Sequence, residues 1–183
     1  MATGKNETAT TGAIPANSIL AITRIFDAPR ELVWKAWTEP ERLAQWWGPK
    51  GFKWKHSKMD FRPDGIFHYC MVSPDGHEMW GKFTYREIAA PKRLVFANSF
   101  SDEEGNTVRA PFSQDWPLEI LNTFTFTEQG GKTTIEMHGI PVNATDKEQK
   151  AFDAAQQSIQ QGFKGTFDQL DEYLVNAVKG KSA

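Results

Sequence analysis

The sequence predicts a single α+β domain in which an antiparallel sheet wraps around a long C-terminal helix. Three observations support this: seven strand-like runs rich in aromatic and β-branched residues, a helical pattern of apolar residues towards the end of the chain, and no repeat or domain-sized linker. With 183 residues, of which 39% are hydrophobic, the chain can bury one sizeable core and is short for two domains.

The N-terminal segment differs in composition from the rest of the chain. Residues 1–17 are rich in Thr, Ala, Asn and Gly and hold no apolar stretch of the kind that a signal peptide needs. We therefore expect a flexible leader over 1–17, one domain over 18–178 and a short tail over 179–183. The run SILAITRIF, residues 18–26, is typical of a first strand.

Two short helices are predicted after this first strand. Asp27 stands where an N-cap belongs and Pro29 where a first-turn proline belongs, which indicates that one helix starts here. A capping box of Thr38 and Glu41 predicts the start of a second helix. The left-handed position expected at Gly48 ends it, because a proline follows directly.

These helices carry four of the seven tryptophans, within the stretch LVWKAWTEPERLAQWWGPKGF. Helices of two or three turns are not stable alone in water. We therefore expect most of the tryptophans to pack into a larger core. Trp47, at the end of the second helix, is the one that could instead stack on a ligand.

Six further runs predict the rest of the sheet. They are residues 52–61, 65–72, 78–88, 93–100, 118–127 and 132–139. Gly130 and Gly131 predict a tight hairpin between the last two. In the first of the six, the apolar residues change parity near Ser57, which indicates a β-bulge or a change of edge there.

The chain closes with a long amphipathic helix. Thr145 and Glu148 form a capping box at its start, and apolar residues then recur every three or four positions until the helix ends before Gly180. Gly162 and Gly165 lie inside it, each at a cost of roughly 1 kcal/mol relative to Ala. Such glycines indicate close approach of another backbone or a space left empty for a ligand.

Four segments together resemble a known family: FDAPRELVWKAWTEPERLAQWWGPKGF, DFRPDGIF, SPDGHEMWGKFTYREIAAPKRLVF and QQGFKGTFDQLDEYL. They are similar to the AHSA1-type branch of the START/Bet v 1-like (SRPBCC) superfamily, named for the C-terminal domain of an activator of the Hsp90 ATPase. The resemblance covers nearly all of residues 18–178. It implies a helix-grip fold, in which a seven-stranded sheet curls around the long C-terminal helix and leaves a cavity for apolar ligands.

Hydrophobicity suggests that two rows of the sheet and the apolar stripe of the long helix would line such a cavity. One row holds Phe67, Tyr69 and Met71, and the other holds Ile120, Asn122, Phe124 and Phe126. Asn98 and Asn122 are the amides in these rows that could orient a ligand whose bulk is apolar. Gln156 either shares the inward helix stripe or lies at its solvated border. The candidate ligand-binding residues are Tyr69, Met71, Asn98, Trp116, Asn122, Phe124, Phe152, Gln156, Ile159 and Phe163.

A long connection over residues 101–117 separates two of the strands. Connections longer than about 12–15 residues without secondary structure are often lids or binding loops. Phe112 and Trp116 are the large apolar residues within it. Two interpretations stay open: both side chains plug a gap in the sheet edge, or Trp116 closes one mouth of the cavity.

No catalytic, metal or cofactor motif is visible, and we expect neither a metal nor a cofactor. Cys70 lies in a strand and has no adjacent base, as an inert core thiol would. His56, His68, His77 and His138 lack the spacing of metal ligands. His56 and His68 could face each other across a hairpin, although solvated surface histidines are the simpler expectation.

The charge balance argues against nucleic acid and membrane surfaces as partners. The net charge is −2, so no global field draws the chain to polyanions. A basic run over residues 50–62 interleaves lysines with Phe52 and Trp54, but strand alternation explains it. One cysteine and no apolar run of roughly 20 residues suggest a cytoplasmic protein. A free edge strand would allow a homodimer.

Three functions remain open. The first, which we prefer, is the binding or sequestration of a small apolar or aromatic molecule. The second is a protein-interaction role like that of an Hsp90 co-chaperone, implied by the resemblance alone. The third is a reaction in the cavity, such as that of a cyclase or hydrolase; no motif in the sequence announces it.

Overall fold

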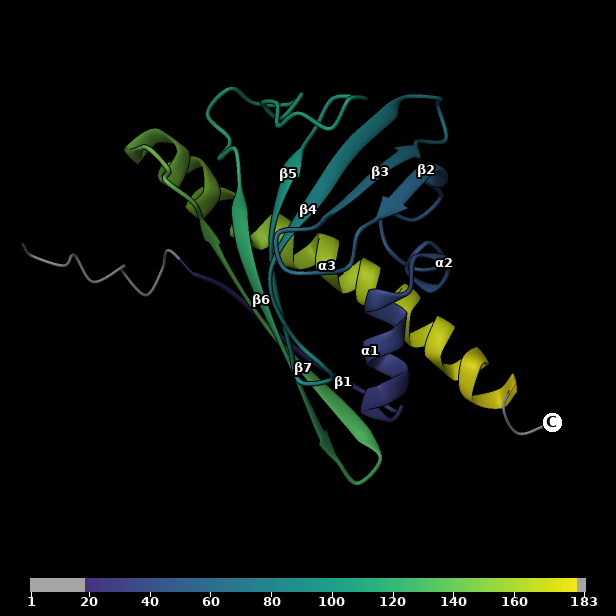
Figure 1. The fold of residues 1–183 in the computed structure, drawn as a ribbon. Coiled ribbons are helices and arrows are strands. Elements are labelled where there is room, and N and C mark those ends of the chain that lie inside the picture. The colour runs from purple at the N-terminus through teal and green to yellow at the C-terminus, as the bar shows by residue number, and fades with distance from the viewer. Residues whose placement is uncertain (1–18, 181–183) are drawn as a thin grey trace, which may run out of the picture.

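The fold is a seven-stranded antiparallel sheet that curls around a long C-terminal helix, as predicted. A computed structural model describes residues 19–180, so the expected leader over 1–17 lies outside the described residues. The elements in chain order are β1 (Leu20–Phe26), α1 (Arg30–Thr38), α2 (Pro40–Leu43), β2 (Lys53–Met59), β3 (Ile66–Val72), β4 (Glu78–Ala89), β5 (Arg93–Phe100), β6 (Ile120–Gln129), β7 (Lys132–Pro141) and α3 (Asp146–Gly180) (Figure 1).

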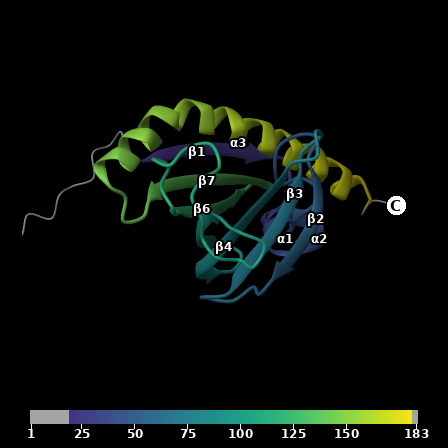
Figure 2. The ribbon, with the colours of Figure 1, turned by 90° about the horizontal axis from the view of Figure 1, so that it is seen from above.

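The sheet has the strand order β1-β7-β6-β5-β4-β3-β2, and every neighbouring pair is antiparallel. Only β1 crosses over to pair with a strand distant in sequence. Viewed from above, α3 lies along one side with β1 beside it. The sheet then curves away from the helix as it passes from β6 to β2 (Figure 2). The predicted Gly130-Gly131 hairpin is present, with both residues at positive φ.

The predicted irregularity of β2 is also present. The register against β3 shifts between Trp54 and His56, so the bulge falls at Lys55, two positions before Ser57. It lets Phe52 and Trp54 on one side of the bulge, and Met59 on the other, pack against the same core.

The inward rows of the sheet are those that hydrophobicity indicated. Phe67, Tyr69 and Met71 on β3 are buried, as are Phe124 and Phe126 on β6. They pack against the apolar stripe of α3, of which the fully buried members are Phe152, Phe167, Leu170 and Leu174. Alternation with period two on the strands and a helical stripe on α3 therefore suffice to place the core.

The N-terminal end of α3 has the predicted capping box. The Thr145 amide donates to the Glu148 carboxylate at 2.8 Å, and the Glu148 amide donates back to the Thr145 hydroxyl at 3.3 Å. The predicted end before Gly180 is wrong, because α3 includes Gly180. A glycine in an exposed last turn costs little, and helix ends vary by a residue or two.

The bracket formed by α1 and α2 buries the tryptophans, as expected. Trp37 and Trp46 are each 1% exposed, and their rings lie 4.8 Å apart. The Trp46 indole donates to the Ala36 carbonyl at 3.0 Å, which ties the segment after α2 to α1. Trp34 is buried too, whereas Trp47 is only partly buried against the core.

Both predicted caps of these short helices are wrong. Pro29, not Asp27, is the N-cap of α1, because Pro29 is still in the extended conformation that precedes a helix. Glu39 is the N-cap of α2, and the Thr38 hydroxyl donates back to the Trp34 carbonyl at 2.9 Å instead of capping Glu41. A threonine hydroxyl in the last turn of a helix commonly donates a hydrogen bond to the carbonyl four residues earlier in the same helix.

Polar contacts hold α3 against the rest of the fold. Arg24 on β1 forms ion pairs with Asp168 at 2.8 Å and Asp171 at 3.3 Å. The Gln169 amide donates to the Gly48 carbonyl at 2.8 Å, where Gly48 has the predicted positive φ of 108°. These contacts fix the second half of α3 and leave its first half to pack on the β5–β6 connection.

Candidate functional site

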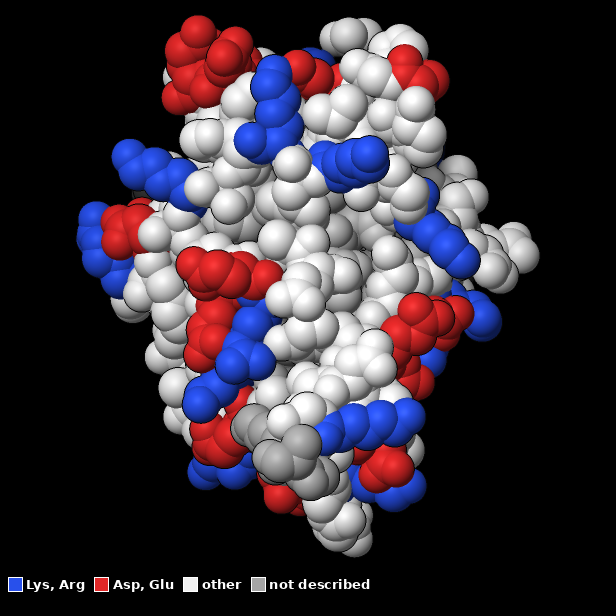
Figure 3. Space-filling model, turned by 90° about the vertical axis from the view of Figure 1, so that its right-hand side faces the viewer, with Lys and Arg blue, Asp and Glu red and all other residues white. Residues whose placement is uncertain are grey.

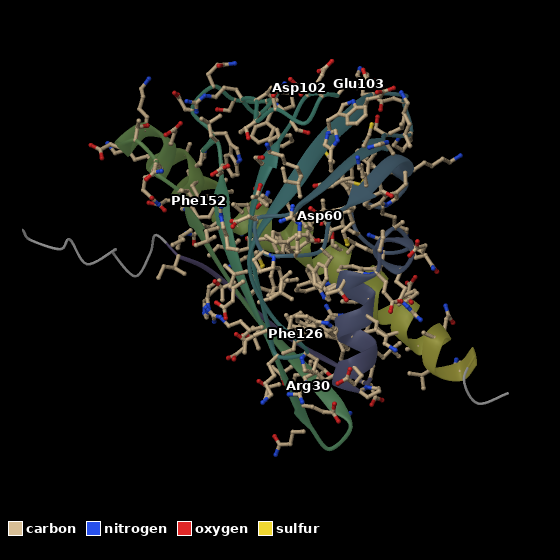
Figure 4. All side chains as sticks on the ribbon, in the orientation of Figure 1. Arg30, Asp60, Asp102, Glu103, Phe126 and Phe152 are labelled. Atoms are coloured by element: carbon tan, nitrogen blue, oxygen red, sulfur yellow. The ribbon has the colours of Figure 1, made fainter. Side chains whose placement is uncertain are left out.

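An apolar cavity of about 190 Å³ lies between the sheet, the first half of α3 and the β5–β6 connection. Seven of the predicted ligand-binding residues line it together: Asn98, Trp116, Asn122, Phe124, Phe152, Ile159 and Phe163. In Figure 4, Phe152 lies nearer than Phe126 to the end of the molecule where Asp102 and Glu103 mark the connection. The cavity is thus at one end of the fold, and the aromatic core fills the other.

Three predicted site residues do not line this cavity. Tyr69 is packed between Trp54 at 5.4 Å, Phe67 at 5.2 Å and Phe83 at 5.7 Å, so no space is left beside it. Its hydroxyl accepts a hydrogen bond from Trp47, and burial raises the pKa of Tyr69 to about 12. Tyr69 therefore supports a lining residue from behind.

Met71 and Gln156 are the other two predicted residues that lie outside the cavity wall. Met71 is buried under Gly48, where an added Cβ would lie 2.4 Å from the Met71 sulfur. Gln156 is half-buried at the border of the α3 stripe and lies outside the residues that line the cavity. Only part of the inward stripe of α3 borders the cavity, so a residue can lie on or beside that stripe without lining the cavity.

Six lining residues were not among the ten candidate ligand-binding residues, although Trp47 was expected as a possible stacking residue and Ile120 belongs to a predicted inward row: Leu20, Trp47, Phe96, Phe100, Phe112 and Ile120. Parity could have found most of the strand residues, because Phe96 and Phe100 flank Asn98 at two positions on β5 and Ile120 is two positions from Asn122 on β6. Leu20 had no such signal. It reaches the cavity because β1 pairs with β7, which sets Leu20 opposite Gly139.

The cavity wall holds the side-chain amides of Asn98 and Asn122, beside the indole N–H groups of Trp47 and Trp116. The strands β5 and β6 bring them to the same face, and the Asn122 amide nitrogen donates to the Asn98 carbonyl oxygen at 2.6 Å. The same nitrogen donates to the Ile120 carbonyl at 3.0 Å. A nearly apolar wall with one amide pair is typical of a site for a small organic molecule.

The β5–β6 connection contributes Phe112 and Trp116 to the cavity wall. Trp116 contacts Phe152 with its ring centroid 5.9 Å away and contacts Phe112 at 5.4 Å. Phe112 also lines the cavity although it is 65% exposed. Both aromatic residues of the connection therefore belong to the cavity wall, an arrangement that a lid and a plug would share.

An ion pair holds this wall to the N-terminal end of α3. Arg109 donates to the Trp116 carbonyl at 3.0 Å and also bonds to the Glu148 carboxylate. Glu148 is buried, and its hydrogen bonds from Arg109 and Thr145 lower the pKa of its carboxyl group. The capping residue of α3 thus also anchors the connection.

The cavity wall offers little for acid–base chemistry. In the part of the chain that the structure describes, no residue lining it carries an ionisable side chain. Burial and the nearby Glu78 carboxylate raise the pKa of the Cys70 thiol, which keeps it protonated and weakly nucleophilic. Within residues 19–180, no group of three or more His, Cys, Asp or Glu residues could hold a metal ion.

The histidines form a contact on the outer face of the sheet. His56 and His68 lie with their rings 5.5 Å apart, while His56 is exposed and His68 is half-buried, so the two histidines lie near each other at the surface. His68 stacks on Trp80 at 5.1 Å and bonds to the Asp102 carbonyl at 3.1 Å. His68 therefore tethers the start of the β5–β6 connection to β3.

The basic run is neutralised in part by nearby acids. Lys55 pairs with Glu78, and Arg62 pairs with Asp60 at 2.8 Å. On the face shown in Figure 3, Lys and Arg are interspersed with Asp and Glu and form no single basic field. No helix of the described residues is long and apolar enough to cross a membrane.

Gly162 and Gly165 of α3 do not line the apolar cavity, although the sequence analysis took them as a possible sign of a space left for a ligand. An added Cβ at Gly162 or Gly165 would meet nothing within 4 Å. Both line a surface hollow beside Pro49 and Lys50. Sequence spacing placed them near the apolar stripe, but they occupy the solvent side of the helix.

Comparisons with known proteins agree on fold and family. Protein Ms6760 from Mycobacterium smegmatis is similar, with 27% identity, a TM-score of 0.70, and coverage of 86% of this chain and 91% of that one. A protein from Arthrobacter aurescens has 25% identity and a TM-score of 0.72, covering 87% of each chain. The AHSA1 protein from Silicibacter pomeroyi shares the fold at 17% identity and a TM-score of 0.67, covering 87% of this chain and 99% of that one.

No curated protein matches the chain. The family described as "Activator of Hsp90 ATPase homolog 1-like protein" matches residues 27–175, which is most of the sequence and includes every helix and strand except β1 and the last residues of α3. The chain therefore belongs to the activator of Hsp90 ATPase homologue 1-like family.

Proposed function

We propose that the chain binds a small apolar or aromatic molecule in the cavity between the sheet, α3 and the β5–β6 connection. The observation that carries the proposal is the cavity itself: its wall is aromatic and aliphatic, with one pair of amides from β5 and β6. A concave pocket of about 190 Å³ with a mostly apolar wall and a few polar groups has the features of a binding site for a small organic molecule.

The volume limits the size of the ligand. An apolar cavity of about 150 Å³ accommodates benzene. A cavity of about 190 Å³ therefore suits a single substituted ring. A sterol or a long acyl chain would need the wall to open, so we expect single-ring compounds to be the preferred class.

A cavity-filling variant tests the proposal. Ile159→Trp should fill the space from α3 and abolish binding of single-ring probes such as toluene and ethylbenzene, because Ile159 lines the cavity. Val175→Trp is the matched control, since it adds the same side chain at an exposed position of α3. Calorimetric titration and ligand-induced thermal shift measure the outcome. Binding that persists in Ile159→Trp, or that is absent from the wild type, would contradict the proposal.

The family description supports a second candidate, a co-chaperone role towards an Hsp90-type chaperone. Its test is direct: the purified chain should raise the ATPase rate of an Hsp90 protein from the same source. The same variant distinguishes the two roles. Ile159→Trp should abolish ligand binding, whereas stimulation of the Hsp90 ATPase through the protein surface should stay at the wild-type level.

A further inference from the structure

The hydrogen bonds around Asn122 fix the orientation of both amides. The Asn122 side chain faces the Ile120 carbonyl at 3.0 Å, and a carbonyl oxygen can only accept. The atom that faces it is therefore the Asn122 amide nitrogen. The same nitrogen lies 2.6 Å from the Asn98 side chain, so Asn98 must present its oxygen to Asn122.

This orientation leaves the Asn98 amide nitrogen without a partner among the described residues. Its oxygen is occupied by Asn122, whereas no hydrogen bond from its nitrogen to residues 19–180 is found. Asn98 is half-buried and lines the cavity beside Phe96 and Phe100. A donor held next to apolar walls gains more from a ligand acceptor than from an apolar group.

Gly139 contributes to this arrangement. It pairs with Asn122 across β6 and β7, and an added Cβ on Gly139 would lie 3.2 Å from the Asn122 side-chain oxygen. The missing side chain leaves room for the Asn122 amide to lie between β5 and β7. Asn122 is therefore a positioning residue, and Asn98 is the group that would meet a ligand.

We infer that the Asn98 amide nitrogen donates a hydrogen bond to an oxygen acceptor of the ligand, so that the cavity selects neutral single-ring compounds that carry one acceptor, such as aryl ketones, aldehydes or esters. This inference rests on the proposed ligand-binding function. Neutrality follows from the wall, because none of its described residues is ionisable and a buried carboxylate would lose its hydration without compensation.

Three single-ring probes of similar size test the selection. Acetophenone carries the acceptor, isopropenylbenzene replaces its oxygen with carbon, and benzoate carries a charge. In the wild type we expect acetophenone to bind and benzoate to fail. Asn98→Leu keeps the size of the side chain and removes the donor. The Kd for acetophenone divided by the Kd for isopropenylbenzene should rise roughly tenfold. The variant loses one hydrogen bond to acetophenone and gains an apolar contact with the hydrocarbon.

Asn122→Leu gives an independent result should Asn98→Leu fold poorly. It removes the bond that fixes Asn98, so Asn98 can turn and offer its oxygen. We expect this variant to gain affinity for benzyl alcohol, whose hydroxyl donates, relative to acetophenone. Amide spectra by NMR establish that each variant is folded before its titration.

The outcomes separate the inference from the function on which it rests. If neither acetophenone nor isopropenylbenzene binds the wild type, the ligand-binding function fails and the inference fails with it. If both bind and Asn98→Leu leaves their ratio within about twofold of the wild type, the cavity binds ligands but Asn98 does not select them. Benzoate binding as tight as that of acetophenone overturns the neutral class.

Discussion

The ring of Trp116 lies 5.9 Å from the ring of Phe152, so the β5–β6 connection packs directly on the first half of α3. The contact is part of the cavity wall, because both residues line the cavity. Trp116 is half-buried whereas Phe152 is fully buried. The connection thus lies over the helix and contributes one large side chain to the wall.

Trp116→Ala should speed ligand release more than it lowers stability. We expect the dissociation rate of a fluorescent apolar probe to rise by roughly tenfold, and the free energy of unfolding to fall by less than about 1 kcal/mol, because lids belong to the least stable parts of a fold. Stopped-flow release and a urea titration measure the two quantities. Val108→Ala is the control, since Val108 is exposed in the same connection and does not line the cavity. Early unfolding with wild-type release would make Trp116 a plug.

Trp37→Ala should destabilise the fold by about 3–5 kcal/mol, the range for removing a core aromatic side chain. Trp37 is 1% exposed and contacts Trp46 at 4.8 Å and Phe124 at 4.4 Å, so its removal leaves a large void between α1 and the sheet. Denaturant titration gives the value. Phe112→Ala, at a position 65% exposed, is the comparison and should cost far less. An equal loss in the two variants would mean that the bracket is not part of the core.

Glu148→Gln should make stability depend less on pH. Hydrogen bonds from Arg109 and Thr145 lower the pKa of Glu148 in the folded state, so its contribution is present above the ordinary value of 4.5. That contribution is lost as the pH falls through the lowered folded-state pKa. The variant should therefore be less stable than the wild type at neutral pH, and the difference should shrink as the pH falls below 4.5. Glu104→Gln, an exposed carboxylate in the connection, is the control. Thermal unfolding of both proteins across pH measures the effect. A stability difference between variant and wild type that does not change with pH would exclude the Arg109–Glu148 ion pair as its cause.

Gly162→Ala and Gly165→Ala should each stabilise the chain by about 0.5–1 kcal/mol. Both residues are helical, and an added Cβ would meet nothing within 4 Å. The gain comes from the reduced conformational freedom of the unfolded chain. Gly48→Ala is the opposite case, because its φ of 108° and the nearby Met71 sulfur both resist a side chain, and it should destabilise. Melting temperatures rank the three variants. A loss of stability at Gly162 or Gly165 would show that the space beside them is needed.

Sequence alone predicted the strands and the inward rows well, because both depend on side-chain alternation that tertiary packing preserves. It failed at the caps of α1 and α2, where the choice between Asp27 and Pro29, or Thr38 and Glu39, depends on backbone conformation. The sequence also could not show which inward positions are packed against other side chains and which border the cavity. Tyr69 and Asn98 both lie on inward rows, yet aromatic rings surround Tyr69 while Asn98 borders the cavity. That difference depends on how side chains of several strands fill a shared volume.

The β5–β6 connection is held at two places that lie outside the cavity. At its start, His68 and Lys82 bond to the carbonyls of Asp102 and Gly105, and nearer its end Arg109 bonds to the Trp116 carbonyl. The anchors at Asp102 and Gly105 use backbone oxygens, and Arg109, itself part of the connection, links the Trp116 carbonyl to Glu148 of α3, so no anchor uses the side chain at position 112 or 116. The side chains at positions 112 and 116 can therefore change while the anchors stay. A lineage of such proteins could acquire new ligands by substitution at these two positions, with the sheet and α3 left as they are.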